Sequence, residues 1–194
     1  DLNMRLVGED DFQVIYEEIL GTAIQLTRAD AGKLQILNTE SKELELLAAR
    51  GFEPALVKDF FRINANSRIS SATALAEGKR TITTFDTPGA HDPDHLYKMY
   101  LDAGFISAQS TPLVPRSGKP VGILSTHWRK PSPLTERELR FLDLLGRFAA
   151  DLIEQWLIKE ALLQSNERIR IAAEAAEMGT WDWNLTNNEV HWNE

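Results

Sequence analysis

The sequence predicts an α+β protein, an antiparallel sheet covered by helices, and its apolar patterning supports this class. Apolar residues from Phe12 to Leu26 recur at steps of three and four, which predicts an amphipathic helix over 11–27. Apolar runs at 33–37 and 44–50, and again at 105–114 and 121–128, flank polar or Pro/Gly turns typical of β-hairpins. Thr135 and Glu138 have the spacing of a capping box, so a long helix is expected from Glu136 to at least Leu163.

Shorter elements are predicted between the two hairpins. The expected elements are a helix at 54–61, a helix at 72–77, a strand at 80–85 and a helix at 95–103. Pro54 suits the first turn of its helix, and Ser70 or Ser71 suits the N-cap of the next. Strands and helices therefore alternate through the middle of the chain.

The C-terminal part has a different character. After Gln164-Ser165-Asn166 a second helical run is expected from Glu167 to Met178. Alternating tryptophans around the turn at Asn187-Asn188 then predict a hairpin. We therefore divide the chain into a first domain at 10–157, a long helix or linker at 136–166 that overlaps its end, and the start of a second domain at 167–194.

Composition restricts the classes of function. The net charge of −8 argues against a nucleic-acid surface, which needs clustered Lys and Arg. No apolar run approaches the roughly 18 residues of a membrane span, so no direct membrane contact is expected. The chain has no cysteine, which excludes disulfides and thiolate chemistry and favours a cytoplasmic location.

Several short motifs, in order, resemble the GAF family of sensor domains over roughly Phe12 to Leu157. They are Ala29-Asp30-Ala31-Gly32, "SSATALAEGK" at 70–79, Phe85-Asp86, Gly104-Phe105-Ile106-Ser107, Pro112-Leu113, "GKPVGIL" at 118–124 and Leu134-Thr135-Glu136. The resemblance implies an antiparallel sheet with helices on both faces. It also implies that a ligand, where one exists, lies between the sheet and the segment from Pro54 to Ala103.

Residues 168–194 resemble the N-terminal helix and first two strands of a PAS domain. The resemblance rests on the Trp-x-Trp pattern in "GTWDWNLTNNEVHWNE". The order GAF, helix, PAS is similar to that of sensor histidine kinases of two-component systems and of diguanylate cyclases. It implies a parent protein of one of these kinds.

The segments that the GAF resemblance places around a pocket supply the candidate ligand-binding residues. These are Phe60, Phe61, Ile69, Thr84, Asp86, Tyr97, Tyr100 and Phe105. His127 is a further candidate from its own strand, because it shares a face with the small polar residue Ser125, which leaves room for a bound group. Aromatic walls with a few polar groups suit a small-molecule cavity, but the same residues suit an aromatic core that holds no ligand. His127 is either a buried, hydrogen-bonded histidine at a strand end or, less favoured, a haem ligand.

Catalysis has little support in the sequence. There is no Gly-rich phosphate loop and no nucleophile motif, so no catalytic residue is assigned. Covalent bilin attachment and GAF-type methionine sulfoxide reduction both need a cysteine and are excluded. His91 and His95 flank Asp92-Pro93-Asp94, which reads as a solvated loop, and no metal site is assigned. The cofactor, if any, is left unknown.

The expected function is that of a sensory module. It would bind a small molecule or a partner and relay its state through a parallel homodimer, formed by the helix from Glu136 to Leu163, to an output domain. The apolar line expected on that helix is Leu142, Leu145, Ala149, Leu152, Trp156 and Leu163. The alternative for its first half is packing on its own sheet. Alternatives for the whole domain are a ligand-free dimerisation spacer and a haem-binding sensor.

Overall fold

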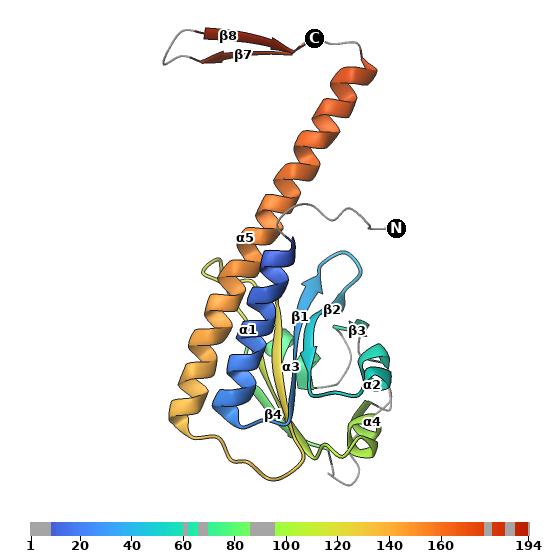
Figure 1. The fold of residues 1–194 in the computed structure, drawn as a ribbon, viewed down its shortest axis with the longest axis vertical. Coiled ribbons are helices and arrows are strands. Elements are labelled where there is room, and N and C mark those ends of the chain that lie inside the picture. The colour runs from blue at the N-terminus through green and yellow to red at the C-terminus, as the bar shows by residue number, and fades with distance from the viewer. Residues whose placement is uncertain are drawn as a thin grey trace. The chain divides into compact units, whose positions relative to one another are not determined.

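The computed structural model describes residues 9–59, 62–65, 70–85, 96–176, 180–184 and 189–193. It consists of two units, Asp1–Glu154 and Gln155–Glu194. The first unit holds a six-stranded antiparallel sheet with the strand order β3-β2-β1-β6-β5-β4 (Figure 1). The elements of the first unit are α1 (Glu9–Thr27), β1 (Ala31–Asn38), β2 (Glu43–Arg50), α2 (Pro54–Asp59), β3 (Arg62–Asn64), α3 (Ser70–Glu77), β4 (Thr81–Thr84), α4 (Leu96–Asp102), β5 (Ser107–Leu113), β6 (Gly122–Trp128) and the first part of α5 (Glu136–Ala175).

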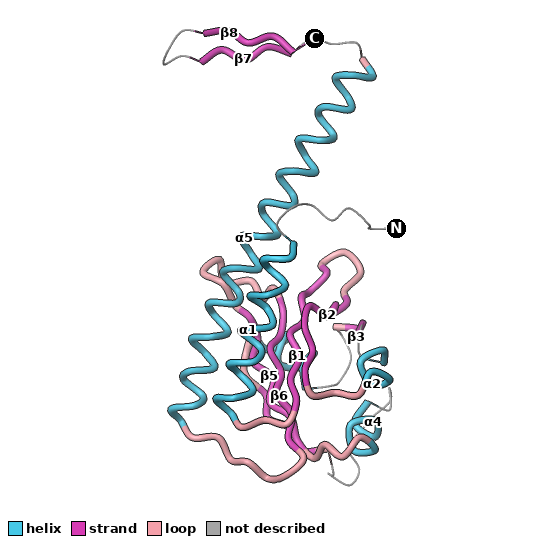
Figure 2. Tube along the Cα trace, in the orientation of Figure 1, coloured by secondary structure: helices cyan, strands magenta, loops and turns pink. Residues whose placement is uncertain are grey.

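One face of the sheet is covered by α1 and the first part of α5 (Figures 1 and 2), and an ion pair between Arg28 and Glu138 joins the end of one helix to the start of the other. Leu34 and Leu124 pair across β1 and β6 and point to this face, and both are fully buried. The backbone of α5 comes close to β5 at Gly146, where an added Cβ would lie 3.2 Å from the Thr111 Cγ2 atom. Helix α5 therefore packs tightly on its own sheet.

The opposite face carries a second core, which α2, α3 and α4 help to build. Its buried members include Ala31 and Ala108 from the sheet, Leu56 from α2, Leu75 from α3 and Tyr100 from α4. Helices on both faces of an antiparallel sheet confirm the predicted fold class. The central strands β1 and β6 are covered on both sides, so their side chains are buried on both faces.

Two elements differ from the sequence-based expectation. Residues Arg62–Asn64 form an edge strand that pairs with β2, although the sequence analysis left this segment without a strand. Helix α5 runs through Gln164-Ser165-Asn166 without interruption and ends at Ala175. Polar residues end a helix only where their side chains cap it or compete for its backbone hydrogen bonds. Residues 164–166 also include no proline or glycine.

The first half of α5 packs on its own sheet, which was the alternative to a dimer seam there. Leu142 and Ala149 are both 0% exposed, because the first unit itself covers them. A different face of the same helix is open, and it carries Phe141, Leu144 and Phe148. Over this half, the apolar line that contains Leu142 and Ala149 is therefore part of the domain core, as the interpretation of a helix packed on its own sheet expected.

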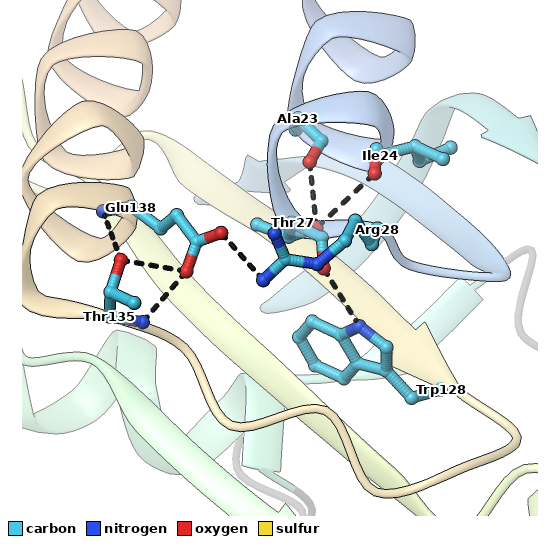
Figure 3. Close-up of polar contacts among 7 residues, drawn as sticks. All are labelled: Ala23, Ile24, Thr27, Arg28, Trp128, Thr135 and Glu138. Carbon is cyan, nitrogen blue, oxygen red and sulfur yellow. Dashed lines mark hydrogen bonds and ion pairs between the residues drawn. The ribbon is translucent and has the colours of Figure 1, made fainter.

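A polar junction joins β6, α1 and α5 (Figure 3). The Trp128 indole N–H donates to the Thr27 carbonyl oxygen at 3.1 Å, at the end of α1. The next residue, Arg28, forms an ion pair of 2.7 Å with Glu138 in the first turn of α5. Thr135 and Glu138 make the reciprocal hydrogen bonds of a capping box, which confirms the predicted start of α5. The end of one helix is thus bonded both to the central strand and to the start of the other helix.

The second unit, taken by itself, contains the remainder of α5 and a hairpin. Strands β7 (Thr180–Asn184) and β8 (Glu189–Asn193) pair in antiparallel register, with Trp181 opposite Trp192. This agrees with the hairpin predicted from the alternating tryptophans. Among the described residues, none of the helices has the length and apolar character needed to cross a bilayer.

Candidate functional site

The candidate site lies on the sheet face that α3 and α4 cover. The pairing register of β1, β5 and β6 brings its polar side chains together. Lys33 of β1 pairs with Ser125 of β6, which in turn pairs with Ser110 of β5. Residues directly opposite in an antiparallel pair point to the same face. Alternation along β6 places His127 on this face too, beside Ala108. Three neighbouring strands therefore aim polar side chains at one place inside the domain.

Serine hydroxyls form a row across this face. The Ser110 Oγ atom lies 2.9 Å from the Ser125 Oγ atom and 3.4 Å from the Ser70 Oγ atom. Ser70 and Ser71 are the first residues of α3, so the amino end of that helix faces the same row. The N–H groups of the first helical turn lack partners within the helix and carry a partial positive charge. The row is thus rich in hydrogen-bond donors.

Lys33 introduces a cation into this buried setting. Its residue is 2% exposed, and burial lowers the pKa of its ammonium group from 10.5 to about 7, because the charged form loses its hydration. The Nζ atom lies 5.8 Å from the centroid of the Tyr100 ring, whose electron-rich face attracts a cation. The charge of Lys33 therefore responds to small changes in its surroundings near neutral pH.

His127 is surrounded by aromatic rings. The centroid distances from its ring are 4.8 Å to Tyr100, 5.1 Å to Phe52, 5.8 Å to Phe105 and 6.3 Å to Phe85. Burial first, and then the nearby charge of Lys33, lower the pKa of His127 well below its usual range, so the imidazole is neutral at neutral pH. Among the described residues, the buried Nδ1 atom has no hydrogen-bond partner. A buried polar atom in this condition calls for a specific explanation.

These groups line one cavity. The lining residues are Lys33, Ser70, Ser71, Phe85, Tyr97, Tyr100, Ser110, Ser125 and His127. The cavity has a volume of about 10 Å³, which is close to the space that one water molecule needs. It combines an ammonium group, hydroxyls and an imidazole on the sheet side with aromatic rings around them. Such a set can donate hydrogen bonds to an acceptor-rich or anionic group.

The structure brings some of the predicted site residues together and separates others. Tyr97, Tyr100 and His127 line the cavity, whereas Phe105 is fully buried behind His127 and Thr84 is exposed at the end of β4. Phe60, Phe61, Ile69 and Asp86 lie outside the described residues, as do His91 and His95. Within the described part of the chain, no cluster of three or more His, Cys, Asp or Glu residues could hold a metal ion.

Sequence reasoning did not place Lys33, Ser70, Ser71 or Ser110 at a site, and it noted only Ser125 of the serine row, as a small polar residue beside His127. A lysine or serine in a strand ordinarily lies on the solvated face of the sheet. In β1 and β6 these residues are buried, because helices cover both faces of the sheet there. A signal was present in the sequence, because four serines that line the cavity lie in segments predicted to be apolar strands or a helix start. Polar residues at central strand positions would have been the feature to follow.

Comparison with known proteins identifies the family. The family model described as GAF domain matches residues 9–154, and the chain belongs to this family. A search of curated proteins found no match. GAF domains are commonly small-molecule-binding modules of signalling proteins.

Solved structures share the fold at low sequence identity. A domain assigned to a two-component sensor histidine kinase of Sinorhizobium meliloti 1021 is 16% identical, with a TM-score of 0.62 over 82% of this chain and 99% of that chain. A GAF domain/HD domain protein of Geobacter sulfurreducens is 16% identical, with a TM-score of 0.62 over 80% of this chain and 99% of that chain. The second GAF domain of DevS from Mycobacterium smegmatis is 18% identical, with a TM-score of 0.51 over 80% of this chain and 97% of that chain.

Proposed function

We propose that this chain is a cytoplasmic sensory module, which binds a small molecule in the cavity of its GAF domain and relays the bound state through α5. The output would be a further domain of a sensor histidine kinase or diguanylate cyclase. The hairpin β7–β8 would be the start of a PAS-like domain on that path. Membership of the GAF family and the donor-rich cavity support the sensing part of this proposal.

The observation that carries the proposal is that two consecutive residues of β6 serve opposite faces of the sheet. His127 lines the cavity, while Trp128 bonds to the end of α1. Arg28 then connects α1 to the first turn of α5 through Glu138. A ligand that binds one arrangement of β6 better than another would therefore also bias the helix junction.

Purified protein gives the direct test of sensing. We expect denaturation of the native chain to release a small molecule that mass spectrometry detects, because a donor-rich buried site tends to retain a ligand from the host. The matched control is the Ser125→Val variant, which removes one hydroxyl from the row and should retain less. Release of nothing from the native chain, together with no thermal shift by any member of a metabolite panel, would contradict sensing.

A parallel homodimer through the exposed seam of α5 is the relay that we propose. The seam comprises exposed apolar residues at heptad spacing: Phe141, Leu144 and Phe148 in the first unit, and Ile158, Leu162 and Ile169 in the second. A repeat of this kind favours helix pairing, with equivalent residues of two chains meeting. Gln155 occupies a position of the same heptad, and a polar residue there helps to fix the register.

Adjacent leucines test which face of α5 forms the dimer. Leu162 lies in the seam and is 58% exposed, whereas Leu163 belongs to the line expected from the sequence and is 43% exposed. We expect Leu162→Glu to weaken the dimer by at least about tenfold, or roughly 1.4 kcal/mol, because like charges would meet across the interface. Light scattering over a range of protein concentrations measures the change.

The same substitution one residue along is the matched control. Leu163→Glu should leave the dimer intact, since that position lies beside the seam. If Leu163→Glu weakens the dimer and Leu162→Glu does not, the seam assignment is wrong. If native protein is monomeric at high concentration, the dimeric relay itself is wrong.

The small size of the cavity favours a second candidate function, that of a dimerisation spacer without a ligand. A cavity of about 10 Å³ is far below the roughly 300–1,000 Å³ typical of small-molecule pockets. The dimer would then be retained while no compound binds. A haem sensor is a third candidate, and visible absorbance of the purified protein tests it.

A further inference from the structure

We propose that the cavity is the binding site for the carboxylate group of a small organic acid, held by Lys33, the serine row and His127. This inference rests on the proposed sensing function and names its ligand class. The acid group would lie against β1, β5 and β6, and the body of the ligand against the rings of Tyr97 and Tyr100.

The hydrogen bonds within the serine row leave one of its hydroxyl protons unused by the row. The hydroxyls of Ser70, Ser110 and Ser125 bring three O–H protons, and the described contacts among them use two. A hydroxyl has one proton to donate, so whichever direction the row adopts, one O–H remains for a further acceptor. A carboxylate oxygen accepts such bonds and makes them stronger than a neutral acceptor does.

Two independent features place positive character around the same cavity. The Lys33 side chain lines it, and so do Ser70 and Ser71, which begin the eight-residue helix α3. Unpaired N–H groups at a helix start attract anions. His127 also lines the cavity, and its buried Nδ1 atom is without a partner among the described residues. A ligand oxygen or hydroxyl would give it one.

Size and wall chemistry select among acidic groups. The volume of about 10 Å³ holds about one water molecule, so the rings of α4 have to shift outward before an acid group can enter. A flat carboxylate needs a smaller shift than a tetrahedral phosphate and is therefore favoured. Aromatic rings from α4 and Phe85 form the remaining wall, which suits an apolar or unsaturated body. We therefore assign the carboxylate to a small, largely apolar acid.

Acetate and acetamide make a matched pair of probes, because they share size and shape and differ in charge. At constant ionic strength, acetate at ten times its dissociation constant should raise the melting temperature by roughly 3–6 °C. Acetamide should leave it unchanged, and inorganic phosphate should act more weakly than acetate. The full chain is used throughout.

Variants locate the response within the molecule. Lys33→Met and His127→Phe should each abolish the acetate shift, whereas Lys79→Met, which changes an exposed lysine after α3, should retain it. Should Lys33→Met fail to fold, Ser125→Ala is the second variant, with acetate-dependent NMR shifts of the His127 ring as the readout. Loss of those shifts in Ser125→Ala would support the assignment.

The possible results distinguish a failure of the carboxylate assignment from a failure of the sensing function. Equal responses to acetate and phosphate, or an acetate shift that survives Lys33→Met, would overturn the carboxylate assignment. A neutral or basic molecule released from the native chain, with no acetate response, would overturn it while leaving sensing intact. Absence of any released molecule and of any thermal shift would overturn both.

Discussion

Raising the pH from about 6 to about 10 should stabilise the native protein relative to Lys33→Met by about 4 kcal/mol. The pKa of Lys33 is about 7 in the folded protein and 10.5 as the ordinary value. Below the pKa of Lys33 in the folded protein, both the folded and the unfolded state hold the proton. The folded state is then destabilised by the full free energy of burying an ammonium group. As the pH rises from 7 toward 10.5 the folded state has lost the proton and the unfolded state still binds it, so that cost is progressively removed.

Urea denaturation of both proteins at several pH values measures this difference. Titrations of groups that are independent of Lys33 are shared by the two proteins, so they cancel when one curve is subtracted from the other. His127 is coupled to Lys33, but burial also holds its pKa well below its usual range, so it adds little to the difference above neutral pH. Lys79→Met is the control, because an exposed lysine should show no such trend. A difference that stays flat from about pH 6 to about pH 10 would mean that Lys33 keeps its proton in the fold.

Leu142→Ala should destabilise the fold by about 2–5 kcal/mol, while Leu144→Ala should change it by less than about 0.5 kcal/mol. Leu142 is 0% exposed and Leu144 is 66% exposed, although they lie two residues apart on α5. Truncating the buried side chain loses its transfer free energy and leaves a cavity against the sheet. Truncating the exposed one removes nothing from the core.

The pair is best measured on a Leu162→Glu background, where unfolding reports on a single chain. Urea midpoints of the two variants then compare the two faces of one helix directly. Similar losses for both leucines would contradict the assignment of a core face and an open face. On the native background, Leu144→Ala should weaken the dimer instead of the fold.

Local patterns in the sequence were sufficient for much of the fold. The start of α5 could be predicted because Thr135 and Glu138 satisfy each other's backbone groups, a contact between near neighbours. The β5–β6 hairpin could be predicted because its turn residues preset the backbone. The face of α5 with Leu142 and Ala149 was on the expected apolar line, and packing on the sheet was one of its two interpretations. The second, open apolar face with Leu144 was not predicted, since both leucines are equally apolar and only packing decides which is covered.

The site was harder to predict than the fold. Tyr100 was among the candidates because the GAF resemblance places its segment around a pocket, and His127 because alternation puts it on one strand face with Ser125. Lys33 was not, because a strand lysine is ordinarily solvated, and its burial depends on helices distant in the sequence that cover both faces of β1. Register between β1, β5 and β6 brings the serines together, and no local pattern specifies that register.

Because neighbouring residues of β6 serve opposite faces of the sheet, the number of residues in this strand is constrained. Side chains alternate with a period of two, so one inserted residue between Ser125 and His127 would send the imidazole to the helices and the indole to the cavity. An insertion of two residues would restore both directions. We therefore expect changes in the length of this strand among related domains to come in even steps wherever the ligand site and the helix junction are both kept.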